Sequence, residues 1–303
     1  MLTGGVGGAK LVLGLQQVMP AADITVIVNT GDDFVHLGLP VSPDIDTLLY
    51  TLAGKANTAQ GWGRQGESWA FMAALRELGG PDWFALGDGD LALHVSRLAA
   101  RADGQPLSAI TARFAAAFGI AARILPMTDN PVATMLDTDI GRLAFQAYFV
   151  GRRCVPVVTG IDFDGAADAR PGPGVLAAIA AAGAIIIAPS NPWLSVDPIL
   201  AAPGIATALR AAAAPVVAVS PIIDGKAIKG PTAKLMTELG LPVTNASIAT
   251  HYRDVIDGLV IDSGDSADGV GIPAATTATL MSTLDDRARV AQTALELAAV
   301  LAT

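Results

Sequence analysis

The fold of this chain is decided at residues 174–189, which read GVLAAIAAAGAIIIAP. The first part has the small and apolar residues of a short helix, and the second is an unbroken apolar run of strand length that stops at Pro189. A strand that is apolar on both sides belongs in the interior of a parallel sheet covered by helices. The run is also well short of the roughly 20 residues that span a bilayer. It therefore predicts one helix–strand unit of an α/β fold, with no membrane association.

The same alternation extends in both directions from this unit. Helices are expected at 174–182, 204–213, 231–239 and 284–301, and strands at 184–188, 215–220 and 258–262. Upstream, strands are expected at 23–29, 122–125, 144–150 and 155–159. Residues from 42 to about 120 carry mainly helical patterns, at 46–52, 68–78, 91–101 and 107–118. The sequence predicts one domain over 1–303, a Rossmann-like three-layer α/β fold with a parallel sheet and a mainly helical insertion at about 42–120.

The composition fits a globular protein that acts on small molecules. Of the 303 residues, 52% are apolar and 16% are charged, and the net charge is −9. A domain that neutralises nucleic-acid phosphates normally carries a basic stripe, so no nucleic-acid partner is expected. The single cysteine, Cys154, supports neither an intrachain disulfide nor a cysteine-based zinc site. No signal-peptide pattern precedes the domain, so a cytoplasmic location is expected.

A glycine cluster opens the chain. Residues 4–10 read GGVGGAK and are followed by the apolar side of a helix. The cluster matches neither G-x-G-x-x-G nor a Walker A loop, because Lys10 stands where a third glycine is needed and no Ser or Thr follows it. It keeps flexible backbone N–H groups at a helix N-terminus, which suit an anion. Gly5, Gly7, Gly8 and Lys10 are therefore candidates for phosphate binding, and a tight turn alone is the alternative.

The opening strand is short. Only three residues precede the glycine cluster, where a strand usually has about five. We therefore expect that a few residues are missing ahead of the given start, and that the first strand of the sheet is weakened.

Two acidic clusters follow. Asp32 and Asp33 come directly after the strand expected at 23–29, at the edge where ligands bind in open α/β sheets. Asp44 and Asp46 open the next helix, and either one alone could simply cap it. Four carboxylates within fifteen residues, beside an anion loop, favour a Mg²⁺ site. One carboxylate left free of metal can orient or deprotonate an attacking hydroxyl.

Two further loops follow buried strands at the same expected edge. Residues 189–195 offer Ser190, Asn191 and Ser195 as hydrogen-bonding groups, and residues 220–231 offer Ser220 and Lys229. Either loop alone could be an ordinary strand–helix turn. Their repetition at one edge favours nucleotide or phosphate binding, with lysines offsetting the repulsion between an acidic protein and a diphosphate.

Histidines and tryptophans carry weaker signals. His36, His94 and His251 are too scattered for a metal triad, and no catalytic role is assigned to them. The stretch WGRQGESW at 62–69, which begins with Trp62, could shelter a planar ring.

Taken together, several strings closely resemble the 2-phospho-L-lactate transferase family, called CofD or FbiA. They are GGVGGAK (4–10), NTGDD (29–33), SPDIDT (42–47), LGD (86–88), PSNP (189–192) and SPII (220–223), with further matches at 62–69, 125–132 and 198–204. No single string decides the matter, but their order and spacing are specific. The similarity runs over nearly the whole chain.

The resemblance implies a transferase of coenzyme F420 biosynthesis with Mg²⁺ as cofactor. In the implied reaction, the terminal ribityl hydroxyl of the deazaflavin FO (7,8-didemethyl-8-hydroxy-5-deazariboflavin) attacks the phosphorus that bears a three-carbon acid, and GMP leaves. The donor is the guanosine diphosphate conjugate of 2-phospho-L-lactate, phosphoenolpyruvate or 3-phosphoglycerate, and no residue here discriminates among the three. The product is coenzyme F420-0 or its analogue.

The resemblance also implies roles for individual residues. Catalytic and metal-binding roles fall on Asp32, Asp33 and Asp46, deazaflavin binding on Asp44, Asp46, Trp62, Asp88 and Gly89, and nucleotide or phosphate binding on Gly5, Gly7, Gly8, Lys10, Ser190, Asn191, Ser195, Ser220 and Lys229. From the clustering of the carboxylates, Asp46 is also expected to be essential for turnover and dispensable for folding.

Position 89 departs from the family. The family usually reads Leu-Gly-Asp-Arg-Asp there, with the arginine associated with the deazaflavin, whereas this chain has Gly89. Arg64 and Arg97 are the candidates to supply the missing charge.

Two other interpretations stay open. A YvcK-like regulator would bind a sugar nucleotide without catalysis, although the string at 42–47 is not expected in that group. A non-catalytic NAD-binding or nucleotide-binding module is disfavoured because the strand at 23–29 ends in Asn29 and not in an acid suited to a ribose. A homodimer is expected only as the common case.

Overall fold

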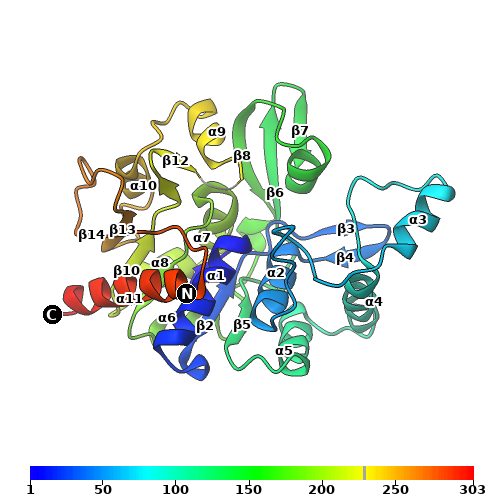
Figure 1. Cartoon of the computed structure of the whole chain (residues 1–303), viewed down its shortest axis with the longest axis horizontal. Coiled ribbons are helices and arrows are strands. Elements are labelled where there is room, and N and C mark those ends of the chain that lie inside the picture. Colours follow the sequence, from blue (N-terminus) through cyan, green and yellow to red (C-terminus); the bar gives the residue numbers. More distant parts are fainter. Residues whose placement is uncertain (228–229) are drawn as a thin grey trace.

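The computed structural model of the chain describes residues 1–227 and 230–303. Its centre is a seven-stranded sheet in which all neighbouring strands are parallel (Figure 1). The strands lie in the order β14 (Ala274–Thr277), β13 (Gly258–Asp262), β10 (Val216–Val219), β9 (Ile185–Ile187), β1 (Leu2–Thr3), β2 (Thr25–Val28) and β5 (Arg123–Pro126). The predicted Rossmann-like α/β fold is confirmed. Lys229, one of the predicted nucleotide-binding residues, lies outside the described residues.

Helices cover both faces of the sheet because strand side chains alternate between two apolar clusters. In β9, Ile185 and Ile187 belong to one cluster and Ile186 to the other. The face of Ile186 is covered by α1 (Gly5–Val18), α2 (Pro43–Leu52), α5 (Leu107–Ala117) and α11 (Leu284–Leu301). The opposite face is covered by α6 (Val175–Ala180), α7 (Asp197–Ala201), α8 (Ile205–Arg210), α9 (Thr232–Glu238) and α10 (Asn245–His251). The inner strands are thus buried on both sides, which explains their continuous apolar sequences.

The strand order changes direction between β1 and β9. From β1 the sheet continues through β2 and β5 on one side, and through β9, β10, β13 and β14 on the other. The loops that leave β1 and β9 at their carboxyl ends therefore diverge, and the crevice between such loops is where open α/β sheets bind ligands. Helix α1 approaches this point closely, because a Cβ added at Gly8 would lie 1.3 Å from Thr3 Oγ1 and one at Gly7 would lie 2.9 Å from the carbonyl of Pro189.

The segment between β2 and β5 carries the hairpin β3 (Phe34–His36) and β4 (Leu39–Val41), followed by α2, α3 (Ala70–Glu77), α4 (Asp88–Ala102) and α5. The hairpin, α3 and α4 project to one side of the sheet (Figure 1, right). In contrast, Ile45 and Leu48 of α2 and Leu107 of α5 join the core beneath α1. Helix α2 begins at Pro43, earlier than expected, because proline suits the first helical turn.

A separate antiparallel sheet was not predicted. It consists of β7 (Gly141–Ala144), β6 (Ala133–Thr138) and β8 (Val158–Asp164), in that order. The prediction of a strand at 144–150 is wrong, because a π-helical turn occupies Ala147–Gly151. Phe145 and Phe149 stack with ring centroids 5.2 Å apart, as residues one helical turn apart can, and Tyr148 is fully buried. Packing of these aromatic rings overrides their preference for strands. Strand β14 and helix α10 were also missed.

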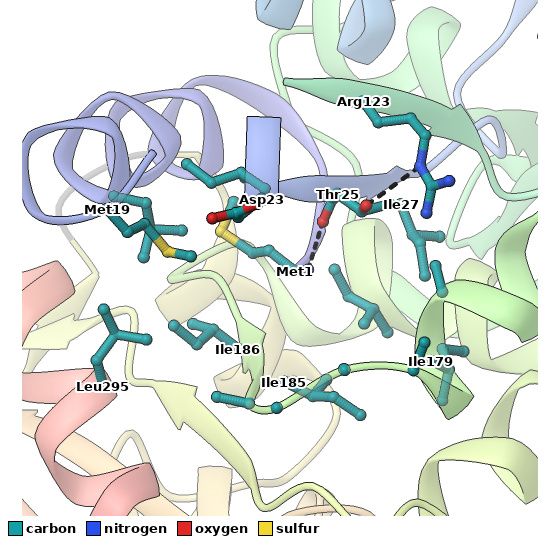
Figure 2. A pocket seen from close by; sticks show the side chains of 18 of the residues that line it. Met1, Met19, Asp23, Thr25, Ile27, Arg123, Ile179, Ile185, Ile186 and Leu295 are labelled. Atoms are coloured by element: carbon teal, nitrogen blue, oxygen red, sulfur yellow. Dashed lines mark hydrogen bonds between the residues drawn. The ribbon is translucent and has the colours of Figure 1, made fainter. Parts of the chain in front are cut away.

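A cavity of about 670 Å³ lies at the amino ends of the strands (Figure 2). Its lining includes Met1, Thr25, Ile185 and Leu295, and the amino group of Met1 donates a 2.7 Å hydrogen bond to the carbonyl of Thr25. This edge is opposite to the loops that leave β1 and β9, so the cavity does not coincide with the ligand crevice. Along the described residues, no helix combines the length and the apolar character that crossing a membrane requires.

The close approach of α1 to β1 makes Gly8→Ala a destabilising change. The new methyl group overlaps Thr3, so α1 must move away from the sheet, and we expect a loss of at least about 2 kcal/mol. Urea unfolding followed by circular dichroism measures it. Gly183→Ala is the matched control, since nothing lies within 4 Å of an added Cβ there and its φ is not positive. Equal stability of the two variants would contradict the packing argument.

Candidate active site

The candidate site lies where the ends of β1, β9 and β2 meet at the carboxyl edge of the sheet. Ser190, just after β9, donates a 2.7 Å hydrogen bond from Oγ to the carbonyl of Gly4, just after β1. Asn29, just after β2, donates from Nδ2 to Asp44 Oδ2 at 3.0 Å. These contacts join the ends of three strands to the start of α2 at the switch point of the sheet.

Asp44 stands at the N-terminus of α1. Its carboxylate accepts hydrogen bonds from Asn29 and from the backbone N–H of Gly5, and a Cβ added at Gly4 would lie 2.5 Å from Asp44 Oδ2. Burial raises the pKa of Asp44 to about 6, against the effect of these two donors. The anion position predicted for the glycine loop is therefore held by a carboxylate of the chain itself.

Asp32 and Asp33 lie beside Asp44 with oxygens that have no partner. Ser42 donates to Asp33 Oδ2 at 2.6 Å, but Oδ1 of Asp33 and Oδ1 of Asp32 are buried without a hydrogen bond. Burial raises the pKa of Asp33 to about 8, against the Ser42 hydrogen bond. Burial and the neighbouring Asp44 carboxylate raise the pKa of Asp32 well above its usual range. Unsatisfied buried carboxylate oxygens are the groups that a bound cation would satisfy.

Asp46 is buried and forms an ion pair with Arg97, which is itself fully buried. The second oxygen of Asp46, Oδ2, lies 3.8 Å from Nδ1 of His94 and has no hydrogen bond. Burial raises the pKa of Asp46, against the opposing charge of Arg97. Arg97 is thus committed to Asp46 and not to the space beside Gly89.

The pair of Asp46 and Arg97 belongs to a network that was not predicted from the sequence. His94 Nε2 lies 3.3 Å from Asp90 Oδ2, and the hydroxyl of Tyr50 donates to Asp90 Oδ1 at 2.5 Å. Asp90, His94 and Arg97 follow the i, i+4, i+7 spacing of one helix face on α4. That spacing was the available signal, and it was missed because His94 was compared only with the other two histidines, as part of a metal triad, and not with Asp90 and Arg97.

The carboxylates could supply part of the coordination shell of Mg²⁺, with the rest left to water and substrate, but they do not form a complete protein site. Within residues 1–227 and 230–303, no three His, Cys, Asp or Glu side chains form a group that could hold a metal. Asp32, Asp33 and Asp46 therefore do not form a three-carboxylate site in this structure. Mg²⁺ commonly takes one or two carboxylates and completes its shell with water and substrate phosphates. The unpartnered oxygens of Asp32 and Asp33 match that requirement.

The predicted nucleotide-binding residues do not all lie at the crevice. Gly5, Ser190 and Ser195 lie at the crevice, with Ser195 against Gly4, where an added Cβ would be 2.8 Å from Ser195 Cβ. Gly7 and Gly8 instead allow the close packing of α1 already described.

Two further side chains of the predicted set hold loops in place. Asn191 Oδ1 accepts from the N–H groups of Trp193 and Leu194, while Ser220 Oγ donates to Asn245 at 2.5 Å. These side chains support the fold of the edge loops.

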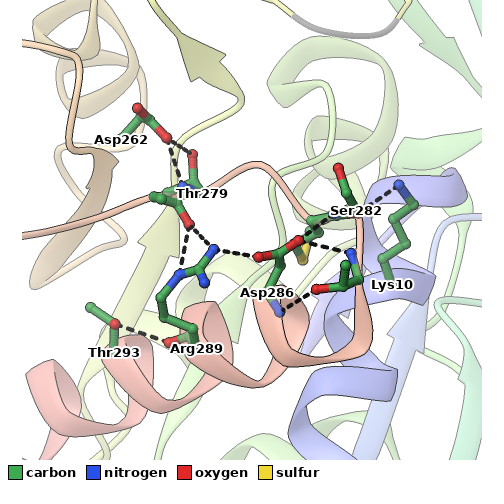
Figure 3. A network of polar contacts seen from close by, with 10 residues as sticks. Lys10, Asp262, Thr279, Ser282, Asp286, Arg289 and Thr293 are labelled. Carbon is green, nitrogen blue, oxygen red and sulfur yellow. Dashed lines mark hydrogen bonds and ion pairs between the residues drawn. The ribbon is translucent and has the colours of Figure 1, made fainter.

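Lys10 points toward the loop before α11. Its Nζ donates to the carbonyl of Met281 at 2.8 Å (Figure 3). The same loop is fixed by the capping box of Thr283 and Asp286 and by the hydrogen bonds that the N–H and the hydroxyl of Thr279 donate to Asp262. The structure therefore places Lys10 in a contact between α1 and the start of α11.

The residues predicted to bind the deazaflavin lie on different elements. Asp44 and Asp46 are in the first turns of α2, as described above. Asp88 holds the start of α3, because it accepts from Ser68 Oγ at 2.5 Å and from the N–H groups of Ala70 and Phe71. Trp62 is about half exposed, and Gly89 lies in the first turn of α4 beside the side chain of Arg64.

The fold and the site define an α/β protein with a buried acidic site at the switch point of a parallel sheet. Residues 1–299 match the model of the family described as 2-phospho-L-lactate transferase CofD. The chain belongs to this family and is a transferase.

Curated relatives agree with the family. A phosphoenolpyruvate transferase of Streptomyces griseus is 41% identical over 98% of this chain and 97% of its own length. A 2-phospho-L-lactate transferase of Methanosarcina mazei is 36% identical over 96% of this chain and 97% of its own length. Among solved structures, a UPF0052-family protein of Bacillus halodurans aligns with a TM-score of 0.63 and 18% identity, covering 97% of this chain and 98% of that one. That last similarity concerns the fold alone.

The raised pKa of Asp33 predicts a pH-dependent cost to stability. Between about pH 4 and pH 8 the folded chain holds a proton on Asp33 that the unfolded chain has released, so stability falls as the pH rises. Asp33→Asn removes this loss while keeping an acceptor for Ser42. In the presence of a chelator at about pH 8.5, its melting temperature should exceed that of the wild type by about 2 °C or more, with a smaller difference at about pH 5. If Asp33→Asn melted at a lower temperature than the wild type at about pH 8.5, the raised pKa of Asp33 would be refuted.

The ion pair of Asp46 changes the expectation for Asp46→Asn. Removing one partner leaves the Arg97 guanidinium buried without a counter-charge, so this variant should lose about 3 kcal/mol of stability as well as activity. The buried ion pair thus predicts a role for Asp46 in folding, which the sequence did not lead us to expect. Urea unfolding of Asp46→Asn, of Arg97→Met and of the double variant measures the coupling. Strictly additive losses would show that the pair does not interact.

Proposed function

We propose that this chain transfers a phosphorylated three-carbon acid from its guanosine diphosphate conjugate to the deazaflavin FO, releasing GMP and forming coenzyme F420-0 or its analogue. Membership of the CofD family supports the reaction class. The single observation that carries the proposal is the buried group of carboxylates, with unpartnered oxygens on Asp32 and Asp33, at the switch point of the sheet.

The crevice between β1 and β9 suits the nucleotide half of the donor. Backbone N–H groups at the start of α1 and hydroxyls of Ser190 and Ser195 gather there. Because Asp44 takes the N–H of Gly5 in this structure, a diphosphate and Asp44 compete for the same donor. A divalent cation between them relieves the repulsion, which supports Mg²⁺ as the cofactor.

Bound Mg²⁺ would neutralise charge on the transferring phosphate, held by Asp32 and Asp33. The ribityl hydroxyl oxygen forms a new bond to the phosphorus that carries the acid, and the bond from that phosphorus to the oxygen of GMP breaks. The hydroxyl proton needs an acceptor near neutral pH. A buried carboxylate of the cluster whose pKa is raised toward neutrality, such as Asp44 at about 6, meets that need.

The donor acid is proposed from the relatives. Several relatives between 41% and 42% identical are named phosphoenolpyruvate transferases, and those named 2-phospho-L-lactate transferases here are 36% identical. We therefore propose the phosphoenolpyruvate conjugate as the first donor to test.

The test is an assay of the purified chain with Mg²⁺, FO and each of three guanosine-diphospho acids, carrying phosphoenolpyruvate, 2-phospho-L-lactate or 3-phosphoglycerate. Mass spectrometry should detect GMP and a phosphodiester of the deazaflavin. Asp32→Asn should lower kcat by about 100-fold or more, because it removes a cation ligand. The exposed Asp254→Asn serves as the control and should keep wild-type turnover.

Absence of product with all three donors would overturn the proposal. Tight binding of a sugar nucleotide without any chemistry would instead favour the regulator interpretation.

A further inference from the structure

The space beside Gly89 is filled by the guanidinium of Arg64. A Cβ added at Gly89 would lie 2.1 Å from Nη1 of Arg64 and 2.9 Å from its Cζ. The two residues come from different segments, since Gly89 lies in the first turn of α4 and Arg64 lies in the connection between α2 and α3. The arginine thus stands where the side chain of residue 89 would begin.

The guanidinium of Arg64 contacts Glu67 on one side and is exposed to solvent on the other. Its Nη1 lies 3.5 Å from Glu67 Oε1, and the other oxygen of Glu67 accepts from the N–H of Gly89 at 2.6 Å. The side chain of Glu67 is 5% exposed, whereas that of Arg64 is 30% exposed. A buried carboxylate therefore fixes the base of the guanidinium, while part of it stays accessible to a ligand.

Two tryptophans stand beside this guanidinium. Trp62 is 48% exposed and Trp69 is 39% exposed, and both line a hollow together with Arg64, Glu67 and Asp90. The cavity itself measures only about 10 Å³, so a planar ring cannot enter it and would lie across its mouth. Half-exposed indoles next to a cation form a surface that suits a flat, conjugated ring carrying negative charge.

The hollow is connected to the acidic site through α4. Asp90 lines the hollow and also contacts Tyr50 and His94, and His94 lies 3.8 Å from Asp46. A ligand with its ring at the hollow and a flexible polar chain along α4 would therefore present that chain to the carboxylates. A ribityl-substituted ring system has this shape.

We propose that Arg64 is the specificity-determining cation for the acceptor. Its guanidinium, which occupies the space where a side chain at residue 89 would begin, donates hydrogen bonds to an oxygen of the conjugated 8-hydroxydeazaflavin ring system. The inference rests on the proposed function. The 8-hydroxyl is conjugated with the ring carbonyls, so its anion is delocalised and pairs well with a planar guanidinium.

The test measures acceptor binding and turnover separately. Arg64→Ala should raise the KM and the Kd for the deazaflavin by about 10- to 100-fold, with kcat changed by less than about 3-fold and the donor KM unchanged. Quenching of the deazaflavin fluorescence gives the Kd without turnover. Arg76→Ala, which removes an exposed arginine of α3 paired with Asp82, is the matched control and should leave the deazaflavin KM as in the wild type.

The double variant Arg64→Ala with Gly89→Arg tests the shared position. Removing Arg64 clears the space into which the Cβ of residue 89 projects, so an arginine fits there, extends from α4 beside the same hollow and should recover part of the lost affinity. Arg64→Gln, with melting temperatures for all variants, separates loss of charge from loss of folding. Wild-type affinity in Arg64→Ala would overturn the inference, and so would a loss that the double variant does not repair. Failure of the wild type to bind or phosphorylate the deazaflavin would instead count against the proposed function.

Discussion

Burial of four carboxyl groups in one site is the constraint on which the rest of this structure depends. The pKa values of Asp32, Asp33, Asp44 and Asp46 are all raised, and burial is the largest cause for each. Fixed donors oppose that cost: Asn29 and the Gly5 N–H at Asp44, Ser42 at Asp33, and Arg97 at Asp46. Oxygens of Asp32 and Asp33 are left without partners. Such a site gives up stability, as groups kept for function and not for the fold commonly do.

The sheet delivers these groups through close backbone packing. The N-terminus of α1 reaches the acidic site only because Gly7 and Gly8 let the helix lie against Pro189 and Thr3. On its far side, Gly14 lets α1 cross α11, since a Cβ there would lie 2.1 Å from the carbonyl of Arg287. Helix α1 is therefore clamped between the sheet and the last helix. Glycines that sequence patterns associate with phosphate loops serve here largely to position a helix end.

The sequence was informative where one local rule decides the structure. Continuous apolar runs identified β9, β10 and β13, and the bounds of α11 were predicted as observed, where the structure shows a capping box of Thr283 and Asp286. Prediction failed at residues 144–150, where stacking of Phe145 on Phe149 outweighs strand propensity. It also failed for the contacts of Asp46, because the ion pair with Arg97 joins α2 to α4 across a stretch with no fixed spacing. Tertiary packing alone decides which carboxylate has a cationic partner, as Asp46 does, and which keeps an oxygen without a hydrogen bond, as Asp32 and Asp33 do.

Helix α4 links the two halves of the candidate site. Its first turn lies against Arg64 and Glu67, and one face carries Asp90, His94 and Arg97 toward Asp46. The half proposed for the donor is built from strand ends, where a change of residue shifts the sheet. The half proposed for the acceptor is built from side chains that meet over the start of one helix. The guanidinium of Arg64 fills the space into which a side chain at residue 89 would project, which explains physically how a glycine is accommodated there.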